Sequence, residues 1–278
     1  MRVLVFSHYY YPEGNAPASR MAALCAHWAR NGHQVEVITC VPNVPNGVVY
    51  EGYRNQLCQT EIIDGVQVTR VWSYLSANRG TVRRIVNFIS YMVMAVLAAW
   101  FRRRPDVVIA TSPQFFCGWA GLIAARLRIQ RVPFILEIRD LWPDSIIAVG
   151  AIANRYVLRS LYWLEKWLYR GASHIVTVGD GYCEDLVAKG VPREKLSVIP
   201  NGVDRDTFWP RQAGDFLSRN GIHNQFTCAY VGTIGMAAGL EIAIEAAERL
   251  RASGRDDVAI LLVGDGAERE KLERIAGE

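Results

Sequence analysis

Short apolar runs rich in valine and isoleucine alternate along the chain with longer stretches in which apolar residues recur at helical spacing. This alternation is typical of β-α-β units, in which helices join parallel strands. Strands are predicted at residues 2–6, 34–39, 106–111, 133–138, 174–178 and 196–199. The pattern therefore predicts an α/β fold built on a doubly wound parallel sheet.

Two local signals refine this prediction. Residues 61–71 have the pattern of a β-hairpin, because Asp64-Gly65 suits a tight turn between two strands. The first helix is expected from about Pro17 to Arg30, and Asn31-Gly32 follows it as a helix terminator. Doubly wound sheets bind ligands outside the carboxyl ends of their strands, so the loops there are the first place to look for a functional site.

A second cycle of the same kind begins late in the chain. The pattern breaks at Pro200, and a strand at 226–231, a glycine-spaced loop, a helix at 240–252 and a strand at 258–263 follow a polar stretch. A complete doubly wound domain takes on the order of 100 to 200 residues. We therefore expect a complete domain at 1–200, a linker at 201–225 and an incomplete second Rossmann-like domain at 226–278.

Composition narrows the class of protein. The chain has 278 residues, of which 51% are apolar and 21% charged, as in a folded globular protein. Its six cysteines form no C-x-x-C pair, so neither a disulfide framework nor a zinc knuckle is indicated. No uncharged apolar stretch reaches the length of a spanning helix, and no signal sequence is evident, so a cytoplasmic protein is expected.

Positive charge is concentrated in one segment. Residues 65–105 contain seven arginines and no acidic residue, although the whole chain carries only +4. Within it, residues 85–104 are apolar nearly all round and have arginines at both ends, which fits either a core helix or a helix lying shallowly in an anionic membrane surface. We favour the second interpretation, with the membrane patch made of Arg83, Arg84, Trp100, Arg102, Arg103 and Arg104.

A second aromatic segment and the basic segment itself each allow a further interpretation. Aromatic residues at 156–169 either add to the membrane surface or pack in the core. Nucleic-acid binding is disfavoured, because the basic segment lacks aromatic residues that alternate with basic ones along a sheet.

The dispersed histidines show no metal-binding spacing, and neither a P-loop nor a G-x-G-x-x-G turn is present, so no metal and no cofactor are predicted.

Five segments carry a resemblance to a known family. They are Tyr10-Tyr11-Pro12-Glu13-Gly14-Asn15-Ala16, Glu137-Ile138-Arg139-Asp140-Leu141-Trp142-Pro143-Asp144, Val198-Ile199-Pro200-Asn201-Gly202-Val203-Asp204, Gly232-Thr233-Ile234-Gly235-Met236 and Leu261-Leu262-Val263-Gly264-Asp265-Gly266. In this order they resemble the family 4 glycosyltransferases of the GT-B fold, in the bacterial branch that builds O-antigen, capsule and colanic-acid-type polysaccharide.

The resemblance implies transfer of a sugar from a nucleotide diphosphate sugar to a hydroxyl, with the anomeric configuration retained and no metal required. It implies an N-terminal domain that holds the acceptor and a C-terminal domain that holds the nucleotide. Together with the basic apolar segment, it leads us to expect a polyprenyl-lipid-linked saccharide acceptor and peripheral attachment to the inner face of the cell membrane. The alternative is a non-catalytic acceptor-binding subunit whose partner supplies the donor domain.

The resemblance, together with the positions of His8 and Ser112 after strand ends, gives the candidate site residues. The candidate catalytic residues are His8, Arg139 and Asp140, and the candidate binding residues are Glu13, Gly14, Asn15, Ser112, Asn201, Gly202, Gly232, Thr233 and Gly235. Local alternatives are a helix cap at Ser112, an ion pair between Arg139 and Asp140, and a hinge at Asn201-Gly202. Residues 222–248 contain no Arg or Lys, whereas many relatives place a basic pair there, so charge stabilisation of the diphosphate has to come from elsewhere.

Overall fold

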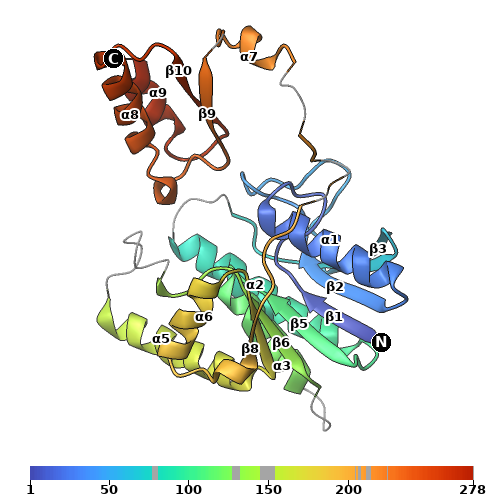
Figure 1. Ribbon diagram of the computed structural model, residues 1–278. Helices are drawn as coiled ribbons and strands as arrows, with labels where there is room; N and C mark the ends of the chain where they lie inside the picture. The colour runs from blue at the N-terminus through green and yellow to red at the C-terminus, as the bar shows by residue number, and fades with distance from the viewer. Residues whose placement is uncertain are drawn as a thin grey trace. The chain divides into compact units, whose positions relative to one another are not determined.

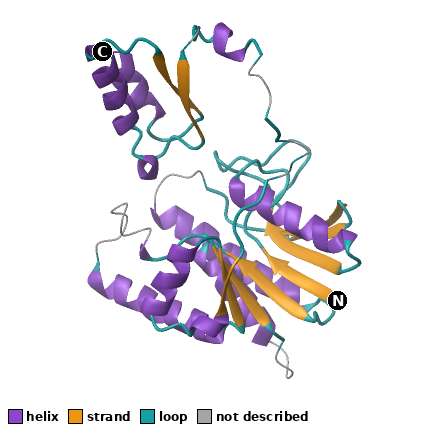
Figure 2. Cartoon of the chain, viewed as in Figure 1, coloured by secondary structure: helices purple, strands orange, loops and turns teal. Residues whose placement is uncertain are grey.

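The computed structural model describes the chain except for residues 77–80, 127–131, 145–153, 204, 206, 207, 211–213, 224 and 278. The chain divides into two compact units, Met1–Gly202 and Val203–Glu278. Each unit is an α/β structure in which strands and helices alternate (Figures 1 and 2). The two units are described separately below.

The first unit contains an eight-stranded sheet in the order β3-β4-β2-β1-β5-β6-β7-β8. Neighbouring strands are parallel except for β3, which is antiparallel to β4. Their bounds are β1 Arg2–Phe6, β2 Gln34–Cys40, β3 Cys58–Ile63, β4 Val66–Val71, β5 Val107–Thr111, β6 Phe134–Ile138, β7 His174–Thr177 and β8 Leu196–Val198. This arrangement confirms the predicted α/β fold class.

The hairpin of β3 and β4 turns where the sequence predicts it. Asp64 and Gly65 both have positive φ, 49° and 78°, as the mirror-image turn of a two-residue hairpin requires. The first strand, however, begins at Cys58, three residues before the predicted start. The hairpin joins the sheet through parallel pairing of β4 with β2, which extends the sheet beyond its parallel core.

Helices cover both faces of this sheet. They are α1 Ala16–Arg30, α2 Thr81–Trp100, α3 Phe115–Arg126, α5 Arg155–Gly171 and α6 Asp180–Ala188, with a 3₁₀ turn, η1, at Arg193–Lys195. α1 contributes Met21 and Cys25 to the core on one face. The larger core on the other face takes residues from the four remaining helices, among them Tyr91 of α2 and Leu186 of α6.

The helix α2 contains most of the long apolar segment that the sequence pattern indicates. Residues Val82–Trp100 of α2 have a mean hydropathy of 1.5 and, by length and composition alone, could cross a membrane. The segment includes Arg83 and Arg84, and the uncharged run that follows them is shorter than a spanning helix, as the sequence analysis states. Core helices of globular proteins satisfy the same criterion, and α2 packs one face on the sheet and on α3, with Tyr91, Ala95 and Ala99 buried.

The second unit has two parallel strands, β9 Phe226–Val231 and β10 Val258–Val263. Its helices are α7 Phe216–Arg219, the 3₁₀ turn η2 Met236–Ala238, α8 Glu241–Ala252 and α9 Arg269–Gly277. A small core of Ile234, Leu240, Ile244 and Leu272 packs α8 and α9 against the two strands. A Cβ at Gly264 would lie 1.8 Å from the Gly232 carbonyl oxygen, so glycine is required where the loops after the two strands meet.

Candidate active site

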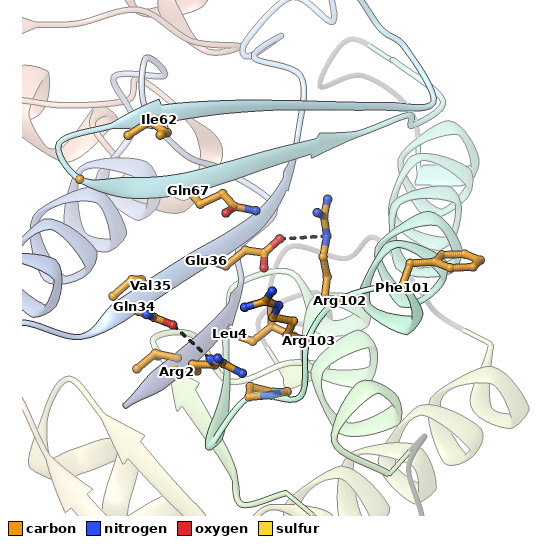
Figure 3. Close-up of a pocket in the computed structure, with 13 residues that line it drawn as sticks. Arg2, Leu4, Gln34, Val35, Glu36, Ile62, Gln67, Phe101, Arg102 and Arg103 are labelled. Carbon is orange, nitrogen blue, oxygen red and sulfur yellow. Dashed lines mark hydrogen bonds and ion pairs between the residues drawn. The ribbon is translucent and has the colours of Figure 1, made fainter.

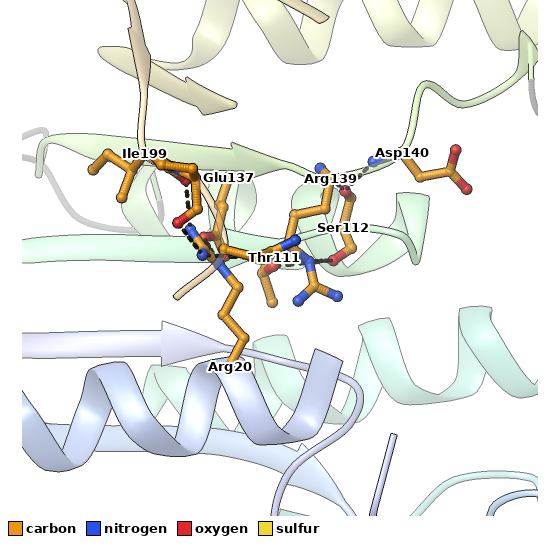
Figure 4. A network of polar contacts seen from close by, with 9 residues as sticks. Arg20, Thr111, Ser112, Glu137, Arg139, Asp140 and Ile199 are labelled. Carbon is orange, nitrogen blue, oxygen red and sulfur yellow. Dashed lines mark hydrogen bonds and ion pairs between the residues drawn. The ribbon is translucent and has the colours of Figure 1, made fainter. Parts of the chain in front are cut away.

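The carboxyl ends of β5 and β6 are joined by hydrogen bonds around Ser112 (Figure 4). The Ser112 hydroxyl accepts from the backbone N–H of Arg139 at 2.7 Å and of Asp140 at 3.3 Å. The Arg139 side chain donates a hydrogen bond from Nε to the Ser112 carbonyl oxygen at 3.1 Å. Ser112 therefore fixes the start of the loop after β6 and places Arg139 and Asp140 beside it.

This geometry corrects one alternative from the sequence. Ser112 was considered as the cap of the helix that follows, but the side-chain oxygen of Gln114 accepts from the backbone N–H of Cys117 in the first turn of α3. The Ser112 hydroxyl instead accepts from the first two backbone N–H groups of the loop after β6. Sequence spacing alone places both residues just before the helix, so only the pairing of β5 with β6 separates their roles.

Arg20, which the sequence analysis did not single out, lies at the centre of the same edge. Its Nε is 2.8 Å from the Glu137 carboxylate, and its other nitrogens donate to the carbonyl oxygens of Ile199 and Pro200 and to the Asn201 side chain at 3.0 to 3.1 Å. Both members of the ion pair are almost fully buried. Arg20 thus connects α1, β6 and the segment that ends the first unit.

The ends of β5 and β6 also leave polar groups available. Arg139 is half-buried, and desolvation lowers the pKa of its guanidinium while the Glu137 charge opposes that effect. Arginine nevertheless stays protonated at neutral pH. The second carboxylate oxygen of Glu137 is buried and has no hydrogen-bond partner among the residues that the structure describes. The site therefore holds fixed positive charge together with unsatisfied acceptor capacity.

The loop after β1 is held by hydrogen bonds from its own side chains to the backbone. Asn15 caps α1, because its side-chain oxygen accepts from Ala18 N at 2.9 Å. The buried Glu13 carboxylate accepts from the backbone N–H of Asn43 at 2.9 Å and of Val44 at 3.2 Å. Gly14 lies between them, is exposed, and would have nothing within 4 Å of an added Cβ. Asn15 and Glu13 are thus occupied by the protein itself, while Gly14 presents open backbone.

His8 lies deeper than a substrate-contacting residue. Its side chain is 4% exposed and packs edge-on against the rings of Tyr9, Phe88 and Tyr91 at 4.8 to 5.3 Å. Burial lowers the pKa of His8 to about 3, so the ring is neutral at physiological pH. We therefore assign His8 no step in the reaction proposed below.

In the second unit, the loop after β9 satisfies part of its own backbone. Gly235 N donates to the Thr233 carbonyl oxygen at 3.0 Å, and the Tyr230 hydroxyl donates to that same oxygen at 2.9 Å. The α8 helix begins a few residues later at Glu241, whose carboxylate accepts from Lys271 of α9 at 2.6 Å. Lys271 is a cation near a helix start that the sequence spacing does not reveal, because α9 follows α8 by a whole strand.

The predicted membrane patch is divided by the structure. Arg83 and Arg84 lie in the first turn of α2, whereas Trp100, Arg102, Arg103 and Arg104 lie at its other end. A helix of this length spans about 30 Å, so the two groups do not form one cluster. A row of exposed apolar side chains runs along α2 from its first turn to its last residue, and we call it the α2 stripe: Val82, Val86, Ile89, Val93, Leu97 and Trp100.

The aromatic residues of α5 divide between surface and core. Trp163 and Trp167 are 59% and 52% exposed and lie 5.6 Å apart, ring centre to ring centre. Tyr169 is buried and donates to the Glu165 carboxylate at 2.8 Å. One side of this helix therefore packs in the core, the other exposes aromatic residues, and contact of that second side with a membrane stays a prediction.

Metal ligands do not gather in the described part of the chain. No group of three or more His, Cys, Asp or Glu side chains there has the arrangement that would hold a metal ion.

Comparison with known proteins places the chain in a family. Residues 15–202 match the model of the glycosyl transferase 4-like domain. The putative colanic acid biosynthesis glycosyl transferase WcaI of Escherichia coli is 27% identical over 99% of this chain and 69% of that protein. A GDP-mannose-dependent alpha-mannosyltransferase of Mycolicibacterium smegmatis is 27% identical over 99% of this chain and 66% of its own length.

Solved structures agree on the fold. The catalytic domain of starch synthase IV from Arabidopsis thaliana superposes with a TM-score of 0.68 at 12% identity, covering 99% of this chain and 70% of that one. Anabaena Alr3699/HepE gives 0.62 at 15% identity, covering 100% and 65%. The chain thus spans about two thirds of the length of these proteins. The chain belongs to the glycosyl transferase 4-like family and is a glycosyltransferase of the GT-B fold.

Proposed function

We propose that the protein moves a sugar from a nucleotide diphosphate sugar to a lipid-linked saccharide acceptor during cell-surface polysaccharide synthesis. Support for the donor comes from the mannosyltransferase relative, whose name specifies GDP-mannose. Support for the pathway comes from the colanic acid relative. A shorter match, 34% identical over 36% of this chain, is an alpha-galactosylglucosyldiacylglycerol synthase of Streptococcus pneumoniae, whose named product is a lipid.

The chemical demand of this reaction is stabilisation of the departing diphosphate. Residues 222–248 contain no Arg or Lys, so a fixed positive charge has to be supplied from another segment. Arg139 is suited to this task, because Ser112 holds both its backbone and its Nε. A preorganised cation of this kind stabilises charge that develops in the transition state without reorganisation. We propose a metal-independent reaction with retention of configuration, in which Arg139 contacts the substrate.

The observation that best supports a lipid-linked acceptor is the exposed α2 stripe next to the candidate active site. Phe88 of α2 contacts the His8 ring directly after β1, so the N-terminal half of the helix lies at the carboxyl edge of the sheet. Val93 and Leu97 are 48% and 51% exposed although they belong to a strongly apolar helix. Arginines flank the stripe, which suits an anionic leaflet. We propose peripheral attachment through α2 to the inner face of the cell membrane.

Transfer of labelled sugar tests the proposal directly. The protein is incubated with a panel of radiolabelled nucleotide sugars and extracted polyprenyl-linked saccharides, in the presence and absence of EDTA. We expect incorporation into the lipid fraction that EDTA does not abolish, and an α-linked product from an α-linked donor by NMR. Arg139→Ala should lower kcat by roughly 10²- to 10³-fold, while Arg30→Ala, an exposed arginine at the end of α1, should leave it unchanged. Absence of transfer to any lipid acceptor would contradict the proposal.

A further inference from the structure

A hollow of about 530 Å³ opens on the first unit at the edge of the sheet opposite to the candidate active site. It is lined by the first residues of β1 and β2, by the β3–β4 hairpin and by the residues that directly follow α2 (Figure 3). Its volume lies in the range of small-molecule sites. Nothing in the proposed glycosyl transfer uses it.

Three arginines and one carboxylate make the lining positive. Arg2, Arg102 and Arg103 line the hollow, and Glu36 is the one acidic residue in the lining. Arg102 is occupied, because its Nε is 3.0 Å from the Glu36 carboxylate and its Nη2 donates to the Thr69 hydroxyl at 3.1 Å. The charges of Arg102 and Glu36 offset each other, so Arg2 and Arg103 give the lining its net positive charge, and the Asp106 carboxylate lies beside it and accepts from the Arg2 backbone N–H at 2.7 Å.

Polar amides and apolar walls complete the lining. Arg2 Nε donates to the Gln34 side-chain oxygen at 3.1 Å, and the Gln67 amide lies further along the same strand ends (Figure 3). Ile62, which is 79% exposed, adds apolar surface. A basic hollow with apolar walls suits an amphipathic anion rather than a fully hydrated one, because both parts of such a ligand are matched.

The rim of the hollow continues into the α2 stripe. Phe101 lines the hollow and is 85% exposed, and the preceding Trp100 is 58% exposed. Exposed aromatic residues beside arginines are the arrangement that side chains adopt at the level of lipid headgroups. A helix that lies on a bilayer through the α2 stripe would bring this hollow to the same surface.

The hollow is too distant to hold the reacting end of the acceptor. Phe88 lies at the carboxyl edge of the sheet and Phe101 at the hollow, and thirteen helical residues correspond to roughly 20 Å. A group bound in the hollow therefore lies roughly 20 Å along α2 from the candidate active site. We propose that the hollow binds the phosphate headgroup of an anionic membrane phospholipid, with Arg2 and Arg103 contacting the phosphate and Phe101 contacting the glycerol and acyl region. The proposal builds on the membrane attachment inferred above.

A soluble short-chain lipid tests this site without a bilayer. Dihexanoyl phosphatidylglycerol, below its micellar concentration, is titrated into the protein by calorimetry, with dihexanoyl phosphatidylcholine and glycerol 3-phosphate as comparisons. We expect saturable binding of the phosphatidylglycerol that is at least tenfold tighter than that of either comparison. Binding of glycerol 3-phosphate as tightly as the lipid would overturn the lipid assignment, and would identify the hollow as a site for a soluble phosphate ester.

Variants then localise the binding. Arg2→Gln combined with Arg103→Gln should weaken phosphatidylglycerol binding at least tenfold, whereas Arg249→Gln combined with Arg251→Gln, an equal charge change on exposed positions of α8, should not. Phe101→Ser should weaken the binding of phosphatidylglycerol and leave any binding of glycerol 3-phosphate unchanged. Equal affinities in all variants, with circular dichroism confirming the fold, would overturn the proposal.

The membrane attachment itself is read out separately by sedimentation with vesicles. Loss of vesicle binding in variants of the α2 stripe, with phosphatidylglycerol titration intact, supports both inferences. If the wild-type protein binds the soluble lipid but does not sediment with anionic vesicles, the proposed membrane attachment is wrong and the proposed headgroup site is still supported.

Discussion

Arg20 in α1 and Glu137 at the end of β6 form a 2.8 Å ion pair although 117 residues separate them in the chain. The same guanidinium donates to the carbonyl oxygens of Ile199 and Pro200 and to Asn201, immediately before the boundary of the first unit (Figure 4). One side chain thus secures the end of the strand that carries Arg139 and the segment that leaves the domain.

Arg20→Ala should destabilise the first unit and release residues 199–201. Removing one partner leaves a buried, unpaired carboxylate, at a cost of about 3–5 kcal/mol. Hydrogen exchange should speed up at the amide of Ile199, which normally donates to the Thr177 carbonyl oxygen. Arg20→Lys keeps the charge beside Glu137 but cannot reach all the acceptors, so it should recover most of the stability and little of the protection. Unchanged exchange in both variants would contradict this role for Arg20.

Acidification should destabilise the protein through His8. Its folded pKa of about 3 lies below the ordinary value of 6.5, so between these values the unfolded chain binds more protons than the folded one. The His8 contribution is complete above about pH 6.5 and is lost as the pH falls toward 3. Urea denaturation of wild-type protein and His8→Gln across this range checks it: the stability difference between the two should narrow on acidification. A constant difference would show that His8 does not titrate this way.

Gly121 should not tolerate a side chain. An added Cβ would lie 2.7 Å from the Ala110 Cβ and 2.8 Å from a ring carbon of Phe134, where α3 packs on the sheet. Overpacking of this kind costs about 1–3 kcal/mol, so Gly121→Ala should lower the free energy of unfolding by that amount. Gly181→Ala in α6 is the matched control, because its Cβ would meet nothing within 4 Å. Equal stability of the two variants would show that the packing relaxes freely.

Membrane attachment should depend on the middle of the α2 stripe. Val93→Asp places a charge on an exposed face that we propose to enter the headgroup layer, and sedimentation with phosphatidylglycerol vesicles should fall at least tenfold. Ile242→Asp, at a 73% exposed position of α8, should leave sedimentation unchanged. The two variants should be equally stable, since neither side chain is buried. Full vesicle binding by Val93→Asp would contradict attachment through α2.

The sequence predicted the sheet because its strands are short, buried on both faces and bounded by clear turn residues. Val3 to Phe6 and Val35 to Ile38 are examples, in which local hydrophobicity and β-branched residues leave few alternatives. The hairpin at Asp64-Gly65 was equally local. For the candidate site, the sequence predicted only what the positions of the strand ends imply. Ser112 and Arg139 each follow a strand, so both were expected at the same edge of the sheet.

What the sequence by itself determined is therefore the α/β class, the order of the elements, the edge on which Ser112 and Arg139 lie, and the basic, apolar character of the segment around α2. Tertiary structure alone decided that Arg20 pairs with Glu137, that His8 and Glu13 turn inward, and that the Ser112 hydroxyl binds the backbone of the loop after β6. The reason is physical: strand and helix preferences act over a few neighbouring residues, whereas ion pairs, burial and the lining of a hollow depend on packing between segments a hundred residues apart.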